Sequence, residues 1–475
     1  MPALRTRQEA RERAIQVFML SLDRMIPSDE SVPLKGATFL EWEEQAAQVR
    51  QAVMPTLLEE RCALEHNARV LEGGRCPFCS ADGAYLKKEE TRPEALSPDG
   101  PVVITKQHCR CHQCDGSFSP QDRDWSLPSE VPLTPKAARK LAREVAKDTF
   151  GPAAKSLNDD WDTQFDPTQI QRWGEAIGKR AVAERDAEVA ACEAGTRPTP
   201  PANAPELIVV GLDGGRVQMR DKDPDSKSRW REDKICTVTT YLPGDGKDPE
   251  EGGRVPQKLV TTHVATMEDC KAIAKLAHVE AERRGLRQAA EVLVMGDNAP
   301  WIDSARDDHF AAYPRIADYE HGVEHLWDAA RAVRSPDTPQ SPEVAALEAE
   351  WETLLYDGKA DEVIQRMRVE AQGLGAVQGT DGPQHPRRLL ENEIGFFERN
   401  KAHMNYPEYR RKGWPIGSGN TEAGVKQFNR RVKGTDQFWN KPGVEAILTL
   451  RGLWISQDER WEKYWKSRPA YSKVA

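Results

Sequence analysis

The segment LIVVGLDGGRVQ, residues 207–218, predicts the start of a buried sheet. Residues 207–212 form a short apolar run rich in β-branched side chains, which is typical of a buried strand. The glycine pair 214–215 then predicts a turn into a second short strand over residues 216–220. We therefore expect Asp213 to stand where the first strand gives way to a loop.

Two further acidic residues occupy comparable settings downstream. Asp297, in EVLVMGDNAPW, follows a short apolar run, and Glu422, in PIGSGNTEAGVKQ, opens a stretch with a helical pattern. Carboxylates at strand ends and on a neighbouring helix are suitable ligands for a pair of Mg²⁺ (or Mn²⁺) ions in phosphoryl transfer. We expect Asp213, Asp297 and Glu422 to converge on such a pair.

The residues around these acids alternate between strand and helix patterns. Beyond the first two strands, the sequence predicts strands over 236–242, 291–295 and 315–318 and helices over 267–284 and 321–333. A ribonuclease H-like nucleotidyl transferase would show this layout, with its first aspartate on the first strand and its second just after the fourth. We expect a core in two parts, with a mostly helical insertion between them: 207–334, 335–415 and 416–475.

The residues before this core predict three further parts and a linker. We expect an N-terminal helical region, a zinc-binding module, a helix-turn-helix DNA-binding domain and a proline-rich linker, over 1–72, 73–130, 131–192 and 193–206. Within the third part, TQIQRWGEAIGKR (168–180) is a candidate recognition helix for the major groove. Any three-helix bundle would give a similar pattern. The fold class is therefore multidomain α+β.

Four of the nine cysteines form two CxxC pairs, which predict a metal site. Cys76, Cys79, Cys111 and Cys114 are the ligand set that tetrahedral Zn²⁺ prefers. The 31 residues between the pairs exceed the usual zinc-ribbon spacing, but a long hairpin could accommodate them. The alternative ligands are His108, Cys109 and His112, and the alternative to a metal site is a set of free buried cysteines.

Composition and charge limit the classes of function. The chain is 38% hydrophobic and 30% charged, and it contains no apolar run long enough for a membrane span. The N-terminus does not resemble a secretory signal, so we expect a cytoplasmic protein. The net charge of −9 argues mildly against nucleic acid as a partner, but residues 399–433 hold nine Lys or Arg and two Glu. Such a local excess is what a DNA-binding groove requires.

Several strings resemble the DDE transposases of bacterial insertion sequences, in particular the Kra-type group allied to the Mutator-like superfamily. They are GLDGGRVQ, VMGDNAPWI, RIADYEHGVEHL, EAILTLRGLW and NKAHMNYPEYRRKGWPIGSGNTEAGVKQFNRRVKG, with CPFC, CRCHQC and FSPQDRDWSL upstream. The resemblance covers roughly residues 40 to 465. It implies a ribonuclease H-like core with Asp213, Asp297 and Glu422 as the catalytic triad. It also implies an accessory pair, Asp318-x-x-His321.

Other residues are candidates for DNA or metal contact. Cationic side chains on both sides of Glu422 could line one side of a DNA groove: Arg410, Arg411, Lys412, Lys426, Arg430, Arg431 and Lys433. Trp301, Trp414 and Trp439 are candidates for stacking on an extruded base, although tryptophan is also a common core residue. His321 and His325 have the i, i+4 spacing of zinc ligands, but a structural role for His325 is the simpler interpretation.

These observations favour a transposase that cleaves the ends of an insertion sequence and joins them to target DNA. Its partners would be double-stranded DNA, as terminal repeats and target, in the bacterial nucleoid. It would act as a homodimer or a higher oligomer, because two ends must be joined in one event. Two alternatives stay open: a domesticated DNA-binding protein that no longer cuts, and a nuclease of the same fold without strand transfer.

Overall fold

The computed structural model describes residues 6–68, 75–82, 85–91, 93–247, 253–296, 299–334, 341–434 and 436–466. The chain is a multidomain α+β protein that divides into two compact units. The first comprises residues 1–183 and 461–475, and the second comprises residues 184–460. Among the residues described, none of the helices combines the length and the apolar character that a membrane-spanning segment needs.

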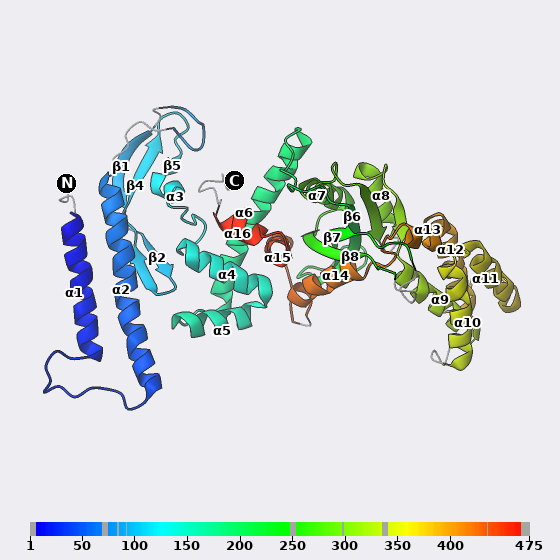
Figure 1. Ribbon diagram of the computed structural model, residues 1–475, viewed down its shortest axis with the longest axis horizontal. Coiled ribbons are helices and arrows are strands. Elements are labelled where there is room, and N and C mark those ends of the chain that lie inside the picture. Colours follow the sequence, from blue (N-terminus) through cyan, green and yellow to red (C-terminus); the bar gives the residue numbers. More distant parts are fainter. Residues whose placement is uncertain are drawn as a thin grey trace. The chain divides into compact units, whose positions relative to one another are not determined.

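The first unit begins with two helices, α1 (Arg7–Met25) and α2 (Phe39–Ala68) (Figure 1). Helix α1 starts with a capping box in which Thr6 and Glu9 satisfy each other's backbone amides. Both helices lie within the predicted N-terminal helical region, and they pack against each other. The exposed face of this pair is unusually apolar.

Small sheets and a helical bundle complete the first unit. The strands β1 (Tyr85–Thr91), β4 (Lys106–Cys111) and β5 (Ser117–Phe118) form one antiparallel sheet, and β2 (Glu94–Ser97) pairs with β3 (Gly100–Val103). The helices follow as α3 (Pro120–Asp124), α4 (Pro135–Lys147), α5 (Phe150–Trp161), α6 (Pro167–Glu193), whose residues 184–193 belong to the second unit, and, near the end of the chain, α16 (Arg460–Lys466). Helix α4 begins with Thr134 as its N-cap and Pro135 as its first residue, where a missing amide hydrogen costs nothing.

A five-stranded mixed sheet organises the second unit. Its strands lie in the order β10 (Arg315–Ala317), β9 (Glu291–Gly296), β6 (Leu207–Gln218), β7 (Trp230–Leu242) and β8 (Gln257–Thr266). β6 is parallel to β9 and antiparallel to β7, and β10 is parallel to β9. β6 is therefore the central strand, with a different partner on each side.

Two details of this sheet differ from the prediction. The glycine pair 214–215 does not turn, because β6 pairs with β7 without interruption from Leu207 to Gln218. The two predicted strands on either side of that pair are therefore one strand. The sequence analysis also missed β8, whose polar and threonine-rich sequence QKLVTTHVAT lacks the apolar run of a buried strand.

Helices cover both faces of the sheet, and the alternation of side chains along β6 shows how. Ile208, Val210 and Leu212 point to a core shared with α7 (Cys270–Arg283) and α8 (Pro300–His309). Leu207 and Val209 point to a second core, formed with α9 (Tyr319–Arg334), α10 (Pro342–Tyr356), α11 (Ala360–Leu374), α12 (Pro386–Asn400) and α13 (Tyr406–Arg411). Figure 1 shows α9 to α12 grouped at one end of this unit. The helical insertion that the sequence predicts is therefore a packed part of the core.

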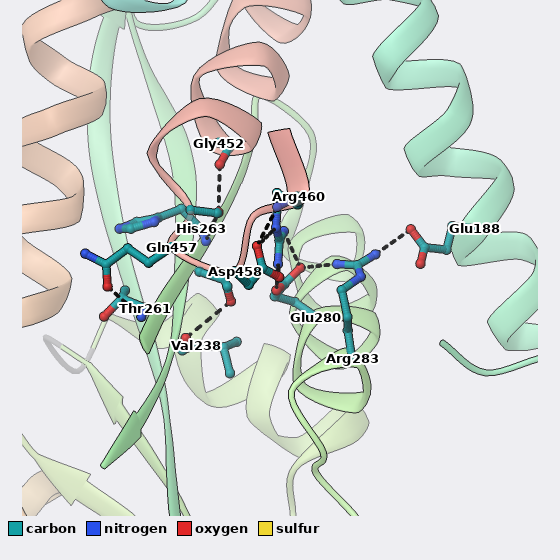
Figure 2. A network of polar contacts seen from close by, with 12 residues as sticks. Glu188, Val238, Thr261, His263, Glu280, Arg283, Gly452, Gln457, Asp458 and Arg460 are labelled. Carbon is teal, nitrogen blue, oxygen red and sulfur yellow. Dashed lines mark hydrogen bonds and ion pairs between the residues drawn. The ribbon is translucent and has the colours of Figure 1, made fainter. Parts of the chain in front are cut away.

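A buried ionic network ties α7 to the segment after α15 (Lys441–Ile455). Glu280 is fully buried, and its Oε2 accepts a hydrogen bond from Nη1 of Arg460 at 2.9 Å (Figure 2). Arg283 donates a second hydrogen bond to the same oxygen. Asp458 accepts from Arg460 Nε at 2.7 Å, and Glu188 pairs with Arg283 at 2.5 Å. Burial opposes ionisation of Glu280, but the two guanidinium groups outweigh it and hold the pKa of Glu280 well below its usual range. The network is thus a fixed charged contact inside the second unit.

Removing the buried centre of this network should destabilise the second unit strongly. Glu280→Ala leaves Arg460 buried without its main partner, and we expect a loss of about 3–5 kcal/mol in the free energy of unfolding. Glu188→Ala is the matched control, because that carboxylate is 41% exposed and pairs with the same Arg283. It should cost less than about 1 kcal/mol. Equal losses in urea unfolding would contradict this account.

Candidate functional site

The parallel pairing of β6 with β9 ends immediately before Asp213. Its last pair is Leu212 with Gly296, and beyond it β6 continues beside β7 alone. The Asp213 side chain is half-buried, and its Oδ1 accepts a hydrogen bond from the amide of Gly214 at 2.6 Å. Asp297, the residue after Gly296, lies outside the described residues. The candidate site begins at Asp213, where the pairing of β6 with β9 ends.

Helix α14 (Gly419–Val432) approaches this part of β6 unusually closely, because Gly211 has no side chain. A Cβ on Gly211 would lie 1.9 Å from Oγ1 of Thr421. That hydroxyl lies 3.0 Å from Oγ1 of Thr237 on β7. A glycine on the helix contributes in the same way, since a Cβ on Gly424 would lie 2.9 Å from Cγ2 of Thr237. The close contact fixes the depth of α14 on the sheet.

The first turn of α14 directs Glu422 away from this contact. Asn420 donates to Oγ1 of Thr239 at 2.6 Å and to Oγ1 of Thr261 at 3.2 Å, so the helix start is held to β7 and β8 as well. The next residue but one, Glu422, is 41% exposed, and its Oε2 lies 3.1 Å from Nζ of Lys426. Its carboxylate is therefore accessible on a helix whose position is fixed.

Asp318, predicted as an accessory residue, anchors the turn that leads into α14. It is buried at the end of β10, and its Oδ1 accepts hydrogen bonds from the amides of Ser418 at 3.0 Å and Glu320 at 3.1 Å. The Ser418 hydroxyl donates to its Oδ2. Burial raises the pKa of Asp318, although the hydrogen bonds from Ser418 oppose that shift. The side chain thus acts on the site through the position of α14.

Glu320 is a carboxylate of this region that the sequence analysis did not single out. A Cβ on Gly417, in the turn before α14, would lie 3.4 Å from its Cγ. Partial burial and the charges of Asp318, Glu352 and Glu422 raise the pKa of Glu320. Acidic groups from α9, α10 and α14 therefore crowd one place. The only signal in the sequence was its position between Asp318 and His321 in the string DYEH.

The two histidines of α9 form a packed pair. His321 and His325 have their Nε2 atoms 3.2 Å apart, and His321 Nδ1 lies 3.2 Å from Oε2 of Glu324. His325 contacts Glu393 at 2.5 Å and stacks on the ring of Phe396, with centroids 3.6 Å apart. His325 therefore joins α9 to α12. Within the described ranges the pair gathers no third ligand for a metal ion.

The cationic residues predicted for DNA contact differ in exposure. Five of them are exposed: Arg411, Lys412, Lys426, Arg430 and Lys433. Arg410 is half-buried over the ring of Tyr356, with its guanidinium carbon 3.5 Å from the ring centroid. Arg431 is instead fully buried, with its guanidinium 5.4 Å from the centroid of Trp439. Arg431 points to the sheet side of α14, so it has no surface to offer to a DNA backbone.

The three tryptophans considered for base stacking also differ. Trp414 and Trp439 are buried at 5% and 4% exposure, and the indole of Trp439 donates to the carbonyl of Val432 at 2.9 Å. Both are therefore core residues. Trp301, at the start of α8, is half-buried with Nζ of Lys234 5.4 Å from its ring centroid. Of the three, Trp301 alone keeps partial access to solvent.

Asp233 is a second acidic residue that the sequence did not mark. It lies opposite Gly215 in the β6–β7 ladder, and a Cβ on that glycine would lie 2.5 Å from its Oδ1. Because side chains alternate along a strand, Asp233 shares a sheet face with Asp213. It is fully buried, and neither carboxylate oxygen has a hydrogen-bond partner among the described residues. Burial raises the pKa of Asp233 to about 6, while Lys234 and Lys433 oppose that shift.

The four CxxC cysteines meet in the first unit. Cys76 and Cys79 face Cys111 and Cys114, and their four sulfur atoms lie within 4.8 Å of one another. The two knuckles have matching turns, since Ser80 and Asp115 both adopt a left-handed backbone with φ near 60°. In each knuckle the sulfur of the first cysteine accepts a hydrogen bond at 3.4 Å from the backbone amide two residues later. The predicted grouping of these cysteines is therefore confirmed, without Cys109, His108 or His112.

The spacing of these sulfur atoms fits a zinc ion. Zn–S bonds of about 2.3 Å in a tetrahedron place the sulfur atoms about 3.8 Å apart. Cys76 lies 3.7 Å from Cys114, and Cys79 lies 3.7 Å from Cys111, measured between the Sγ atoms. Backbone hydrogen bonds lower the pKa of Cys111 to about 7, whereas the pKa values of Cys79 and Cys114 are raised, with burial and the neighbouring thiols opposing their own backbone hydrogen bonds. The cluster could bind one Zn²⁺.

Comparison with known proteins adds little to this description. No family model matches the chain, and no curated protein matches it in sequence. Among solved structures, it is similar to one titled "Drosophila P element transposase strand transfer complex", with a TM-score of 0.30 and 9% sequence identity. The match covers 68% of this chain and 93% of that chain. A likeness this weak carries no argument about the fold or the function.

The contact between Gly211 and Thr421 predicts a sharp steric effect. Gly211→Ala would push α14 off the sheet, and we expect a loss of about 1–3 kcal/mol in the free energy of unfolding. Gly419→Ala is the matched control on the same helix, because no atom lies within 4 Å of a Cβ there. Adding Thr421→Ala to Gly211→Ala should restore part of the loss. Urea unfolding of the four proteins measures these differences.

The buried Asp233 predicts a pH dependence of stability. The pKa of Asp233 in the folded protein, about 6, lies above its ordinary value near 4. The protonated carboxyl therefore makes its full contribution to the free energy of unfolding below pH 4, and this contribution is lost as the pH rises through 6. Asp233→Asn should therefore be about 2–3 kcal/mol more stable than the native protein at pH 7.5 and nearly equal to it at pH 4. Glu232→Gln, on its exposed neighbour, should match the native protein at both pH values. A pH-independent difference for Asp233→Asn would contradict this assignment.

The cysteine cluster predicts a stoichiometry. Metal analysis of the purified chain should find one zinc per chain, and Cys79→Ser should lose it together with the ordered structure around β4 and β5. Cys109→Ser is the control, because Cys109 is buried next to the cluster but outside it. Zinc lost from the Cys109→Ser protein, but kept by Cys79→Ser, would show that the ligand set is different.

Proposed function

We propose that this chain is a DNA transposase of the DDE type, with a ribonuclease H-like core that cleaves the ends of an insertion sequence and joins them to target DNA. The observation that carries the proposal is the docking of α14 on β6. The contact of Thr421 with Gly211 lies two residues before Asp213 and one before Glu422. Asp213 and Glu422, two of the three proposed catalytic residues, are thus held next to the same close contact between β6 and α14.

The order of strands supports the same proposal. Asp213 lies on the first strand of the second unit, and Asp297 directly follows β9, the fourth strand of that unit. The last β6–β9 pair, Leu212 with Gly296, joins the residues that precede the two aspartates. This is the layout that a ribonuclease H-like nucleotidyl transferase would have.

The proposed cofactor is a pair of Mg²⁺ or Mn²⁺ ions held by Asp213, Asp297 and Glu422. When bound, such ions activate a water or a 3′-hydroxyl and stabilise the leaving oxygen of an in-line displacement. Burial is the main cause of the raised pKa of Glu320, and the charges of Asp318, Glu352 and Glu422 add to it; a cation bound nearby would relieve that repulsion. Asp318 contributes through Ser418, which it holds at the start of α14.

Other parts of the chain have roles that follow from the same proposal. The exposed Arg411, Lys412, Lys426, Arg430 and Lys433 would neutralise DNA phosphates near the site. The zinc-bound module and the helix-turn-helix formed by α5 and α6 would bind the terminal repeats. Two copies would act together, because two ends are joined in one event.

A cleavage and joining assay tests the proposal. The full chain is incubated with Mg²⁺ or Mn²⁺ and duplexes from the flanks of its own gene, either intact or pre-cut. We expect cleavage of the first and joining of the second. Asp213→Asn, Asp297→Asn and Glu422→Gln should each reduce both reactions by about 10²-fold or more. Glu291→Gln, at the opposite end of β9 from Asp297, should leave them unchanged.

Each result separates the candidate functions. Cleavage without joining of pre-cut ends would favour a nuclease that lacks strand transfer. Specific binding without cleavage would favour a domesticated DNA-binding protein. Undiminished cleavage by Asp213→Asn protein would show that the metal ligands have been chosen wrongly.

A further inference from the structure

The N-terminal helices carry most of the exposed apolar side chains of the described chain. Of the 20 large apolar residues that are exposed, 13 lie within residues 15–58, in α1, α2 and the segment between them. Monomeric proteins rarely leave such a concentration of apolar surface in water. This segment therefore requires a partner that covers it.

Among the described residues, helix α1 packs mainly against α2 and leaves a second side open. The strip that faces α2 buries only Ala10 and Ser21, both of them small residues. The second strip contains Ile15, Phe18, Met19, Leu22 and Ile26, at spacings of three and four residues. Ile15, Met19 and Ile26 are 55–58% exposed. A helix of 19 residues that buries so little gains little to offset the entropy of ordering it.

Helix α2 has a matching strip. Met54, Leu57 and Leu58 are 40–44% exposed and lie on one side of the helix by the i, i+3, i+4 rule. Met54 and Leu57 lie away from Pro55 and Cys62, which face the β2–β3 hairpin, and Leu58 borders that side. The helix pair therefore offers one apolar strip on each helix while its other contacts are satisfied.

The charge of this segment selects the kind of partner. Residues 7–61 contain seven Lys or Arg and ten Asp or Glu, a net charge of −3. A negative surface does not favour DNA or an anionic membrane, both of which attract cationic segments. An apolar face on a pair of helices with mixed charges around it is suited to another pair of helices.

We infer that the outer face of α1 and α2 is a dimer interface, in which the same face of a second copy completes a four-helix bundle. The seven exposed residues of the two strips, Ile15, Phe18, Met19, Ile26, Met54, Leu57 and Leu58, present roughly 600 Å² of apolar area. Because about 65% of a homodimer interface is apolar, that area corresponds to roughly 900 Å² per subunit. A standard stable interface buries about 800 Å² per subunit. The area is thus sufficient for a lasting dimer.

This inference deepens the proposed function, in which two copies act together, because it names the surface that joins them, and its evidence is independent of the catalytic site. Sedimentation equilibrium of the full chain should give twice the 53.3 kDa of one copy. Met19→Glu combined with Leu58→Glu should raise the dissociation constant at least about 100-fold, since both charges would be buried in the interface. Val369→Glu is the matched control, because Val369 on α11 is an apolar residue with 66% exposure in the other unit. It should stay dimeric.

Two further measurements distinguish loss of the dimer from unfolding of the first unit. Unchanged zinc content and helicity of the double variant show that its first unit is folded. Hydrogen exchange of the native chain should speed up in α1 and α2 on dilution, and in no other described helix. A monomeric native chain, or a double variant that stays dimeric, would overturn the inference. Loss of the dimer with cleavage retained, or the reverse, separates this inference from the proposed catalysis.

Discussion

The second unit depends on one steric condition, which is that Gly211 has no side chain and leaves the space above it free for Thr421. Thr421 fills that space and reaches Thr237 on the next strand, so α14 lies deep on the sheet. Ser418 and Asn420, which precede Thr421, add hydrogen bonds to Asp318 and to β7 and β8, and these bonds fix the rotation of the helix start. Packing without voids makes this arrangement sensitive to a single methyl group. The exposed position of Glu422 follows from the buried position of its neighbour.

Buried charge has two different outcomes in the same sheet unit. Glu280 is fully enclosed, yet Arg460 and Arg283 satisfy it, so it stays ionised. Asp233 is equally enclosed but has no hydrogen-bond partner among the described residues, so burial raises its pKa and its carboxyl keeps its proton up to about pH 6. The contrast shows that burial alone does not decide the state of a carboxylate; its partners do. Asp233 is held beside Gly215 on the face that also carries Asp213, where an ionised group without a partner is costly.

The two units obtain their order in different ways. The second unit has two apolar cores that cover the two faces of its sheet. The cysteine module has only a small core of Cys76, Cys109, Cys111 and Phe118, so a metal ion would supply much of its stability. The N-terminal helices have still less to bury within the chain. A second copy would give them the core that their own sequence leaves incomplete.

The sequence by itself determined the features that depend on local pattern and chemistry. Apolar runs predicted β6 and β9, the CxxC spacing predicted the cysteine cluster, and the helical insertion was predicted from its periodicity. Only the tertiary structure decided that Gly214 and Gly215 stay within a strand, that the polar segment 257–266 is a strand, and that Arg431 is buried. It also brought Glu320 and Asp233 to the region of Asp213 and Glu422. Each of these outcomes depends on a partner distant in sequence, since a glycine, a threonine-rich strand or a charged residue takes its role from the surface it packs against.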